Sequence, residues 1–239
     1  LELTKSSART VDVAPEVDNQ VRMIQELSGG AIVLNCNDYT HFNGNISAGA
    51  AGIQAINVPA RRKSIKSLLF VGNSQTFGAG VQRTVFNTSS GGHMNLVDYQ
   101  IKVGSIMHPA TPIRCNFNVG ADINTRAEAF EELTKCFMPV NNVIGLGGLS
   151  RVNWAVADGD AANMAATGGT PTYCPLGADM EAFQRTAIEA GLDTSSRSTP
   201  ISLLLNLAGG VAQAINIDAY VVYDALYYID RSGVISVSH

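Results

Sequence analysis

Apolar and polar residues alternate most regularly near the end of the chain. From Ile217 to Ile229 every second residue is apolar, whereas Asp218 and Asp224 fall on the other side of the alternation. Because successive side chains of a β-strand point to opposite faces of a sheet, this pattern predicts a strand with one buried face. The turn-forming residues 230–233 follow, and the apolar run 234–237 predicts a partner strand that closes a β-hairpin.

Shorter apolar runs earlier in the chain predict further strands. Each run is only a few residues long and is separated from the next by loop-forming residues, among which glycines occur in clusters. This spacing is typical of strands joined by loops. We expect strands at residues 31–36, 53–58, 64–71, 97–103 and 201–207.

Two segments have the spacing of short helices. Thr125 and Glu128 form a capping box, in which each side chain can bond a free backbone N–H at a helix start. The helix that follows has one apolar stripe, made of Ala127, Phe130, Leu133 and Phe137. A second helix is predicted from Asp179 as N-cap to Gly191, whose left-handed conformation would end it. Its apolar face holds Met180, Phe183, Ala187 and Ala190, and both stripes favour core packing over cofactor contact.

Two long segments, at about residues 72–95 and 139–178, have no sustained period. Both are rich in glycine, asparagine and threonine, and the second contains Trp154, the only tryptophan. Loops longer than about 15 residues usually carry a function or are disordered. We expect the segment around Trp154 to be a folded excursion.

Composition and charge exclude several classes of protein. The chain has 239 residues, 46% of them hydrophobic and 15% charged, so it is too apolar to be disordered over most of its length. A net charge of −4 provides no broad cationic face, and we expect no specific nucleic-acid recognition. The most apolar stretch, 201–229, is interrupted by polar residues such as Asn206 and Asp224, so no membrane-spanning helix is expected.

Candidate catalytic and metal-binding groups are dispersed. The histidines His41, His93, His108 and His239 form no metal-binding pair, and no nucleophile elbow or phosphate-binding glycine loop is present. Asp158 and Asp160 lack the later ligands of a calcium loop. The cysteines Cys36, Cys115, Cys136 and Cys174 have neither zinc spacing nor the density of a disulfide framework, and we expect free, buried thiols. We therefore expect no enzyme activity, no cofactor and no metal.

One basic cluster, Arg61 to Lys63, precedes the apolar run at 64–71. It could contact nucleic acid or an acidic partner. The favoured interpretation is a solvated strand edge, because charges on edge strands prevent unwanted strand pairing.

Several short blocks, in their order along the chain, resemble one protein family. They are residues 10–17 (TVDVAPEV), 56–70 (INVPARRKSIKSLLF), 99–113 (YQIKVGSIMHPATPI), the helix at 126–137, 191–194 (GLDT), 217–226 and 229–235. Together they resemble the second jelly roll of double jelly-roll, or hexon-like, major capsid proteins of tailless double-stranded DNA viruses. The resemblance is strongest to the polinton, adintovirus and virophage-like branch.

The resemblance implies an all-β protein, a jelly-roll β-sandwich with two short helices and long loop excursions. It implies a structural protein of the virion, assembled in an infected host cell as trimeric, pseudo-hexagonal capsomers of an icosahedral shell. Its partners would be two further copies, neighbouring capsomers, penton and minor capsid proteins, and the N-terminal jelly roll of the same protein. On this view residues 1–28 are a linker or arm from that preceding jelly roll, and 29–239 are the jelly-roll domain.

Two further expectations follow from the resemblance. The first residue is Leu1 and not methionine, so we expect the chain to be a piece of a longer protein. The side chains expected at contacts between subunits are Trp154, Phe130 and Phe137.

The alternative function is a stand-alone β-sandwich module that binds a ligand or receptor through its long loops. A metalloenzyme of the cupin type is disfavoured, because its histidine cluster is missing from the sequence.

Overall fold

The computed structural model describes residues 23, 26, 30–74, 96–115, 127–141, 154, 175–181, 191–196, 200–211, 214–230 and 234–238. The chain divides into two compact units. The larger unit is Asn37–Asp224, and the smaller unit combines Leu1–Cys36 with Ala225–Ser238.

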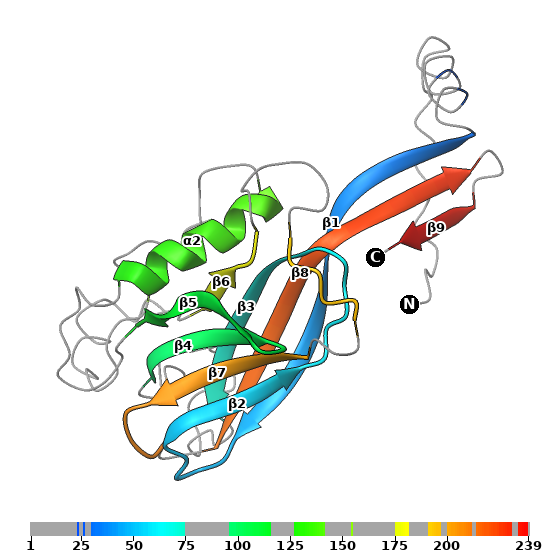
Figure 1. Cartoon of the computed structure of the whole chain (residues 1–239). Helices are drawn as coiled ribbons and strands as arrows, with labels where there is room; N and C mark the ends of the chain where they lie inside the picture. Colours follow the sequence, from blue (N-terminus) through cyan, green and yellow to red (C-terminus); the bar gives the residue numbers. More distant parts are fainter. Residues whose placement is uncertain are drawn as a thin grey trace, which may run out of the picture. The chain divides into compact units, whose positions relative to one another are not determined.

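Among the described residues, eight strands make up the two sheets of the sandwich (Figure 1). They are β1 (Ala31–Ile46), β2 (Gly52–Val58), β3 (Ile65–Ser74), β4 (Leu96–Val103), β5 (Ile106–Arg114), β6 (Leu176–Asp179), β7 (Ile201–Leu207) and β8 (Ile215–Asp230). One sheet has the order β1-β8-β3-β6 and the other the order β2-β7-β4-β5. The first strand therefore pairs with the eighth, the second with the seventh, the third with the sixth and the fourth with the fifth. This is a jelly roll, and the predicted all-β sandwich is confirmed.

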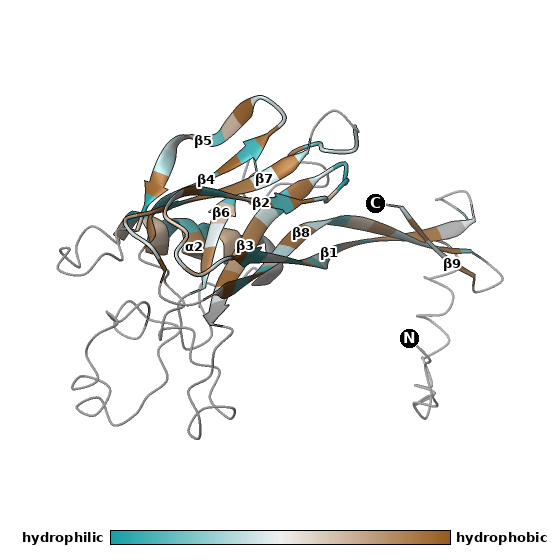
Figure 2. Cartoon of the chain, turned by 90° about the horizontal axis from the view of Figure 1, so that it is seen from below, coloured by the Kyte–Doolittle hydropathy of each residue, from teal (hydrophilic) through white to brown (hydrophobic). Residues whose placement is uncertain are grey.

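The core lies between the two sheets, which form separate layers in Figure 2. Strand β7 shows the reason for the layering, because Ile201, Leu203 and Leu205 are buried while the residues between them are partly exposed. One apolar face per strand drives the two sheets together. Phe70 of one sheet meets Tyr99 of the other edge to face, with ring centroids 5.1 Å apart.

Strand β8 confirms the period-two prediction only in part. Ile217, Ala219 and Val221 are buried as expected. Val222 and Asp224, which lie on the opposite face, are buried as well. The sequence predicted one buried face for this strand, and at Asp224 the opposite face is buried as well, because that carboxylate lies against a buried lysine of the neighbouring strand.

The smaller unit contains the predicted closing hairpin. Strand β9 (Ile235–Ser238) pairs antiparallel with the end of β8, where Ile229 lies opposite Ile235. Asp230 Oδ1 accepts the N–H of Val234, and this contact ties the turn together. The turn residues 231–233 lie outside the described residues.

Helix α2 (Ala127–Asn141) lies next to β3, β5 and β6. Its buried side chains are Ala129, Leu133 and Cys136, whereas Phe130 and Phe137 are half-buried and Ala127 is exposed. The predicted apolar stripe is thus right at Leu133, but the buried face of the helix is turned toward Ala129 and Cys136. The small side chains of these two residues allow the helix to approach the sheet closely. Thr125, the predicted cap, lies outside the described residues. No helix among the described residues is long and apolar enough to cross a membrane.

Several predicted boundaries are corrected. Strand β1 continues to Ile46, well beyond the predicted end at residue 36, and β5 was not predicted as a strand. The two excursions are shorter than expected, since β3 continues to Ser74, α2 continues to Asn141, and β6 lies within the second excursion. Strand β6 has only four residues, one of them the glycine Gly177. Four residues are too few to produce a recognisable alternation of apolar and polar positions.

The predicted second helix falls mostly on residues 182–190, outside the described residues. Asp179 Oδ1 accepts the N–H of Glu181 at 3.1 Å, as an N-cap does. Gly191 does not have the left-handed conformation expected of it. Glycine is required there for space, because a Cβ at Gly191 would lie 2.4 Å from the carbonyl oxygen of Ile65.

Candidate functional site

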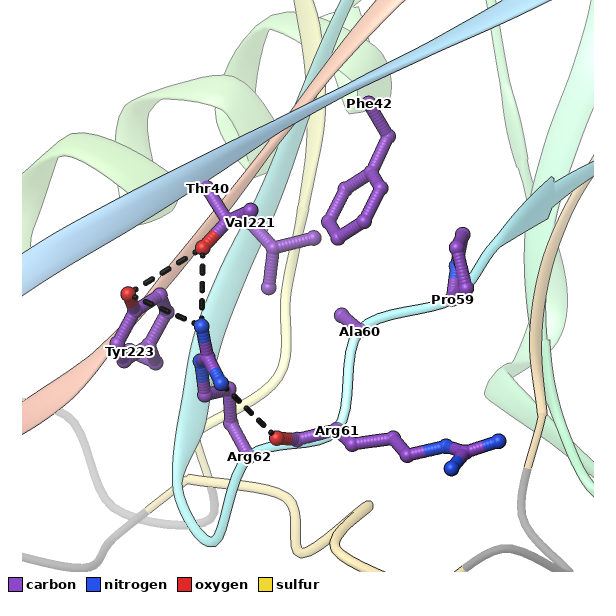
Figure 3. Close-up of a pocket in the computed structure, with 8 residues that line it drawn as sticks. All are labelled: Thr40, Phe42, Pro59, Ala60, Arg61, Arg62, Val221 and Tyr223. Carbon is purple, nitrogen blue, oxygen red and sulfur yellow. Dashed lines mark hydrogen bonds between the residues drawn. The ribbon is translucent and has the colours of Figure 1, made fainter. Parts of the chain in front are cut away.

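A pocket of about 350 Å³ opens beside the connection between β2 and β3 (Figure 3). Its wall combines an apolar side with a cationic side and is lined by Thr40, Phe42, Pro59, Ala60, Arg61, Arg62, Val221 and Tyr223. These residues come from β1, β8 and the connection, and they all belong to the larger unit. In Figure 3, Phe42, Val221 and Ala60 form the apolar side, and the guanidinium of Arg62 lies beside Tyr223.

Thr194 fixes the backbone that carries Arg62. The Thr194 side chain is fully buried, and its hydroxyl oxygen accepts the N–H of Arg62 at 3.2 Å. The same hydroxyl lies 3.2 Å from the carbonyl oxygens of Ala60 and Arg62, to one of which it can donate. The N–H of Thr194 also donates to the Arg62 carbonyl at 2.8 Å. The connection is therefore held rigidly where it forms the pocket wall.

The guanidinium of Arg62 is oriented by neutral groups. Its Cζ lies 4.5 Å from the ring centroid of Tyr223, a cation–π contact. Its Nη2 donates to Thr40 Oγ1 at 3.3 Å and to the Tyr223 hydroxyl at 3.4 Å. That hydroxyl in turn donates to Asp38 Oδ2 at 3.1 Å.

Arg62 keeps unused capacity to bind an anion. Among the described residues no carboxylate forms an ion pair with its guanidinium, whose Nη1 donates to the Arg61 carbonyl at 3.3 Å and whose buried Nε has no hydrogen-bond partner. Arg61, at the same wall, is exposed. A planar guanidinium that no described carboxylate neutralises, beside an apolar wall, suits a carboxylate attached to an apolar group. The cluster Arg61 to Lys63 is not on an edge strand, since the β3 that follows it lies between β8 and β6.

A second polar cluster lies in the interior of the larger unit. Lys66 Nζ is 2.8 Å from Asp224 Oδ1 and 3.7 Å from Glu181 Oε1. Ser64 Oγ donates to Asp224 Oδ2 at 2.6 Å. Burial raises the pKa of Glu181, and the nearby positive charge of Lys66 opposes this effect.

The residues predicted to contact other subunits lie near α2. The Trp154 ring is buried and packs at a tilt on Phe130, with centroids 5.3 Å apart. Its Nε1–H donates to the Pro175 carbonyl at 2.9 Å. Phe137 lies seven residues after Phe130 on the helix and is half-buried. Their role at a subunit contact stays a prediction.

The described histidines and cysteines do not gather into a metal site. His41 Nε2 lies 2.9 Å from Asp218 Oδ1. No group of three potential metal ligands occurs within the described ranges. Cys115 and Cys136 are buried, as predicted, whereas Cys36 is exposed. His93, His239, Cys174, Asp158 and Asp160 lie outside the described residues.

Sequence reasoning singled out the basic cluster but missed its partners. Asp38, Thr40 and Tyr223 are more than 20 residues from Arg62, and only strand pairing brings them together. The interior cluster left a weak signal, because Lys66 and Asp224 are single charges within apolar runs. Such charges indicate a buried ion pair only when the partner strand is known.

Comparison with known proteins finds likeness at the level of structure. No family model matches the chain, and no curated protein matches it. The PBCV-1 protein VP54, fitted into a reconstruction of the virophage Sputnik, aligns with a TM-score of 0.49 and 10% identity over 91% of this chain and 54% of VP54. The major capsid protein of mavirus aligns with a TM-score of 0.38 and 10% identity over 87% of this chain and 41% of its own. The major capsid protein of Faustovirus aligns with a TM-score of 0.42 and 8% identity over 90% of this chain and 36% of its own.

The mavirus and Faustovirus proteins are major capsid proteins. The chain spans about half the length of VP54, the first of them.

Proposed function

We propose that this chain is a structural domain of a viral major capsid protein, the second jelly roll of a double jelly-roll subunit. In this proposal three subunits form a pseudo-hexagonal capsomer, and capsomers tile an icosahedral shell in the virion. The neighbours would be the N-terminal jelly roll of the same protein, other capsomers, and penton and minor capsid proteins. Its role would be adhesion and shape, with no catalysis.

One observation carries the proposal: blocks of the resemblance that are far apart in sequence are joined by hydrogen bonds. Ser64 in the block 56–70 donates to Asp224 in the block 217–226 and accepts the N–H of Gly191 in the block 191–194. Residues whose side chains are in contact limit which residue types fit at each other's positions. The resembled blocks joined by these hydrogen bonds therefore have a physical reason to occur together in one chain. This joint occurrence, on a jelly roll, supports membership in the resembled class.

Exposed apolar side chains supply surface for assembly. In the smaller unit, Val33 and Leu34 of β1 and Ile235 and Val237 of β9 are exposed. In the larger unit, the edge strand β5 exposes Ile106 and Met107. Contacts between subunits bury surface of this kind.

The test is a mass determination on the protein from its natural source, denatured for the covalent chain and native for the assembly, with electron micrographs of the same sample. We expect trimers and shells, and a chain or partner fragment that accounts for a preceding jelly roll. A complete 25.2 kDa chain that stays monomeric without particles would overturn the proposal. Replacing Ile235 and Val237 by serine should weaken assembly and leave the melting of the sandwich unchanged, whereas Ser236→Ala in the same strand serves as the matched control.

The pocket at Arg62 favours a second candidate, a module that binds a ligand carrying a carboxylate. Titration with a short acidic peptide, followed by NMR, should shift resonances of Arg62 and Tyr223 in the wild type and not in Arg62→Gln. Saturable binding by a monomer that forms no particles would favour this candidate over the capsid proposal.

A further inference from the structure

The interior cluster places an amine against a carboxyl group with little water around them. The exposed fraction of the side chain is 8% for Lys66, 4% for Asp224 and 1% for Glu181. Burying an ion costs several kcal/mol unless the pairing is very good. Among the described residues, the one cation of Lys66 faces the two carboxyl groups of Asp224 and Glu181.

A β-bulge directs Lys66 toward Asp224. Ile65 lies opposite Tyr223 and Ser67 lies opposite Val222, so Lys66 is the extra residue of β3. Bulges change the direction of a side chain and are common next to reactive sites. Asp224 follows Tyr223 directly on β8, and its N–H donates to the Ser64 carbonyl at 3.0 Å.

The Asp224 carboxyl is polarised as an acyl group would need to be. Ser64 Oγ donates to its Oδ2 at 2.6 Å, while Lys66 Nζ lies at its other oxygen, Oδ1. The Ser64 hydroxyl is itself fixed, because its oxygen accepts the N–H of Gly191 at 3.1 Å. The carboxyl carbon is one covalent bond beyond Oδ1, so the amine nitrogen has only a short distance to move before it can attack.

We propose that Lys66 and Asp224 condense to an amide bond inside the folded chain. The amine nitrogen attacks the carboxyl carbon, a C–N bond forms, and one C–O bond breaks. The ammonium and carboxylate together lose one water, and no oxidant, reductant or activating group is consumed. The product is an uncharged isopeptide that joins β3 to β8.

Glu181 moves the protons in this step. Because burial raises its pKa, it can carry a proton beside the reacting pair and deliver it to the departing oxygen. It regains a proton from the attacking amine, so it is unchanged at the end. Ser64 is a positioning residue that holds the carboxyl.

Two physical effects favour the amide. Groups held in contact react as if at very high concentration. Condensation also removes two buried charges, and the released water leaves an interior in which little water is available for hydrolysis. This inference is independent of the proposed function.

The experiment is the intact mass of the full chain, purified folded and then denatured. We expect the sequence mass minus one water, and after digestion a branched peptide that joins the segment of Lys66 to that of Asp224. Lys66→Met should show the full sequence mass. Glu181→Gln, which keeps the size of the side chain, should slow bond formation about 100-fold or more. Asp224→Asn should lose ammonia and not water.

The ion pair of Lys135 with Glu132 is an internal control. It joins the same kinds of groups, but the Lys135 side chain is 36% exposed, so no branch is expected there. A folded wild type that keeps the full sequence mass after prolonged incubation at 37 °C would overturn the proposal. A water loss that persists in Lys66→Met, or a branch at another lysine, would also overturn it. An unchanged rate in Glu181→Gln would remove Glu181 from the mechanism.

Discussion

Replacing Gly177 by alanine tests how closely α2 packs on β6. A Cβ at this position would lie 2.8 Å from Cys136 Sγ on the helix and 2.8 Å from Leu69 Cδ2 on β3. Favourable contacts between carbon atoms are about 3.5–4.0 Å long, so the neighbours must move by about 1 Å. The movement would also disturb the bond from the Tyr99 hydroxyl to the Gly177 carbonyl, which is 2.5 Å long.

The expected loss of stability follows from this overlap. Overpacking of a dense core costs about 1–3 kcal/mol. In a chain of this size each kcal/mol lowers the Tm by about 2–4 °C. We therefore expect Gly177→Ala to lower the Tm by about 2–12 °C.

The assays are thermal unfolding for the Tm and urea unfolding for the free energy, both followed by circular dichroism, with Gly209→Ala as the matched control. A Cβ at Gly209 meets nothing within 4 Å, so that variant should stay within about 0.5 kcal/mol of the wild type. Adding Cys136→Ala should make Gly177→Ala less costly than the two single effects predict, because the sulfur is one of the clashing atoms. Equal stabilities of Gly177→Ala and Gly209→Ala would refute the reasoning.

Three further changes test other contacts. Tyr99→Phe should cost about 1–3 kcal/mol at neutral pH, measured by urea unfolding, because the Gly177 carbonyl loses its donor. Burial raises the pKa of Tyr99 well above its ordinary 10.0, so above pH 10 the unfolded chain binds fewer protons than the folded chain. The stability of the wild type therefore falls as the pH rises. The difference in stability between the wild type and Tyr99→Phe should narrow over the same range. Thr194→Val should cost about 1–3 kcal/mol, because the N–H of Arg62 loses its acceptor, and an unchanged melting temperature would contradict that assignment. Val221→Asp should abolish soluble folding, since it puts a charge on the buried face of β8; soluble, cooperatively melting protein would count against the strand's placement.

The regular part of β8 and the hairpin with β9 were predictable from the sequence. Both the alternation of apolar and polar residues and the turn-forming residues involve neighbours in the sequence. The conformation of such neighbours depends mainly on local bond rotations, so it can be predicted without the tertiary structure. Strand β6 was not predictable in this way. Its short segment 176–179 is a strand because β3 pairs with it, and its glycine is required by Cys136 on a helix far away in sequence.

The candidate site, too, was only partly predictable from the sequence. The basic cluster at Arg61–Lys63 was visible as a run of like charges, but its surroundings were not. Tyr223 was expected only as one more apolar residue of a strand, and in the structure it orients Arg62.

The sequence by itself determined the class of fold, since alternation and loop spacing depend only on the order of residues. The pairing of the first strand with the eighth, and of the third with the sixth, was decided by tertiary structure. So was the burial of Lys66 against Asp224, 158 positions later, although the alternating pattern put Asp224 on the face opposite the core. The physical reason is that burial depends on what covers a face, and the segments that cover it are distant in sequence.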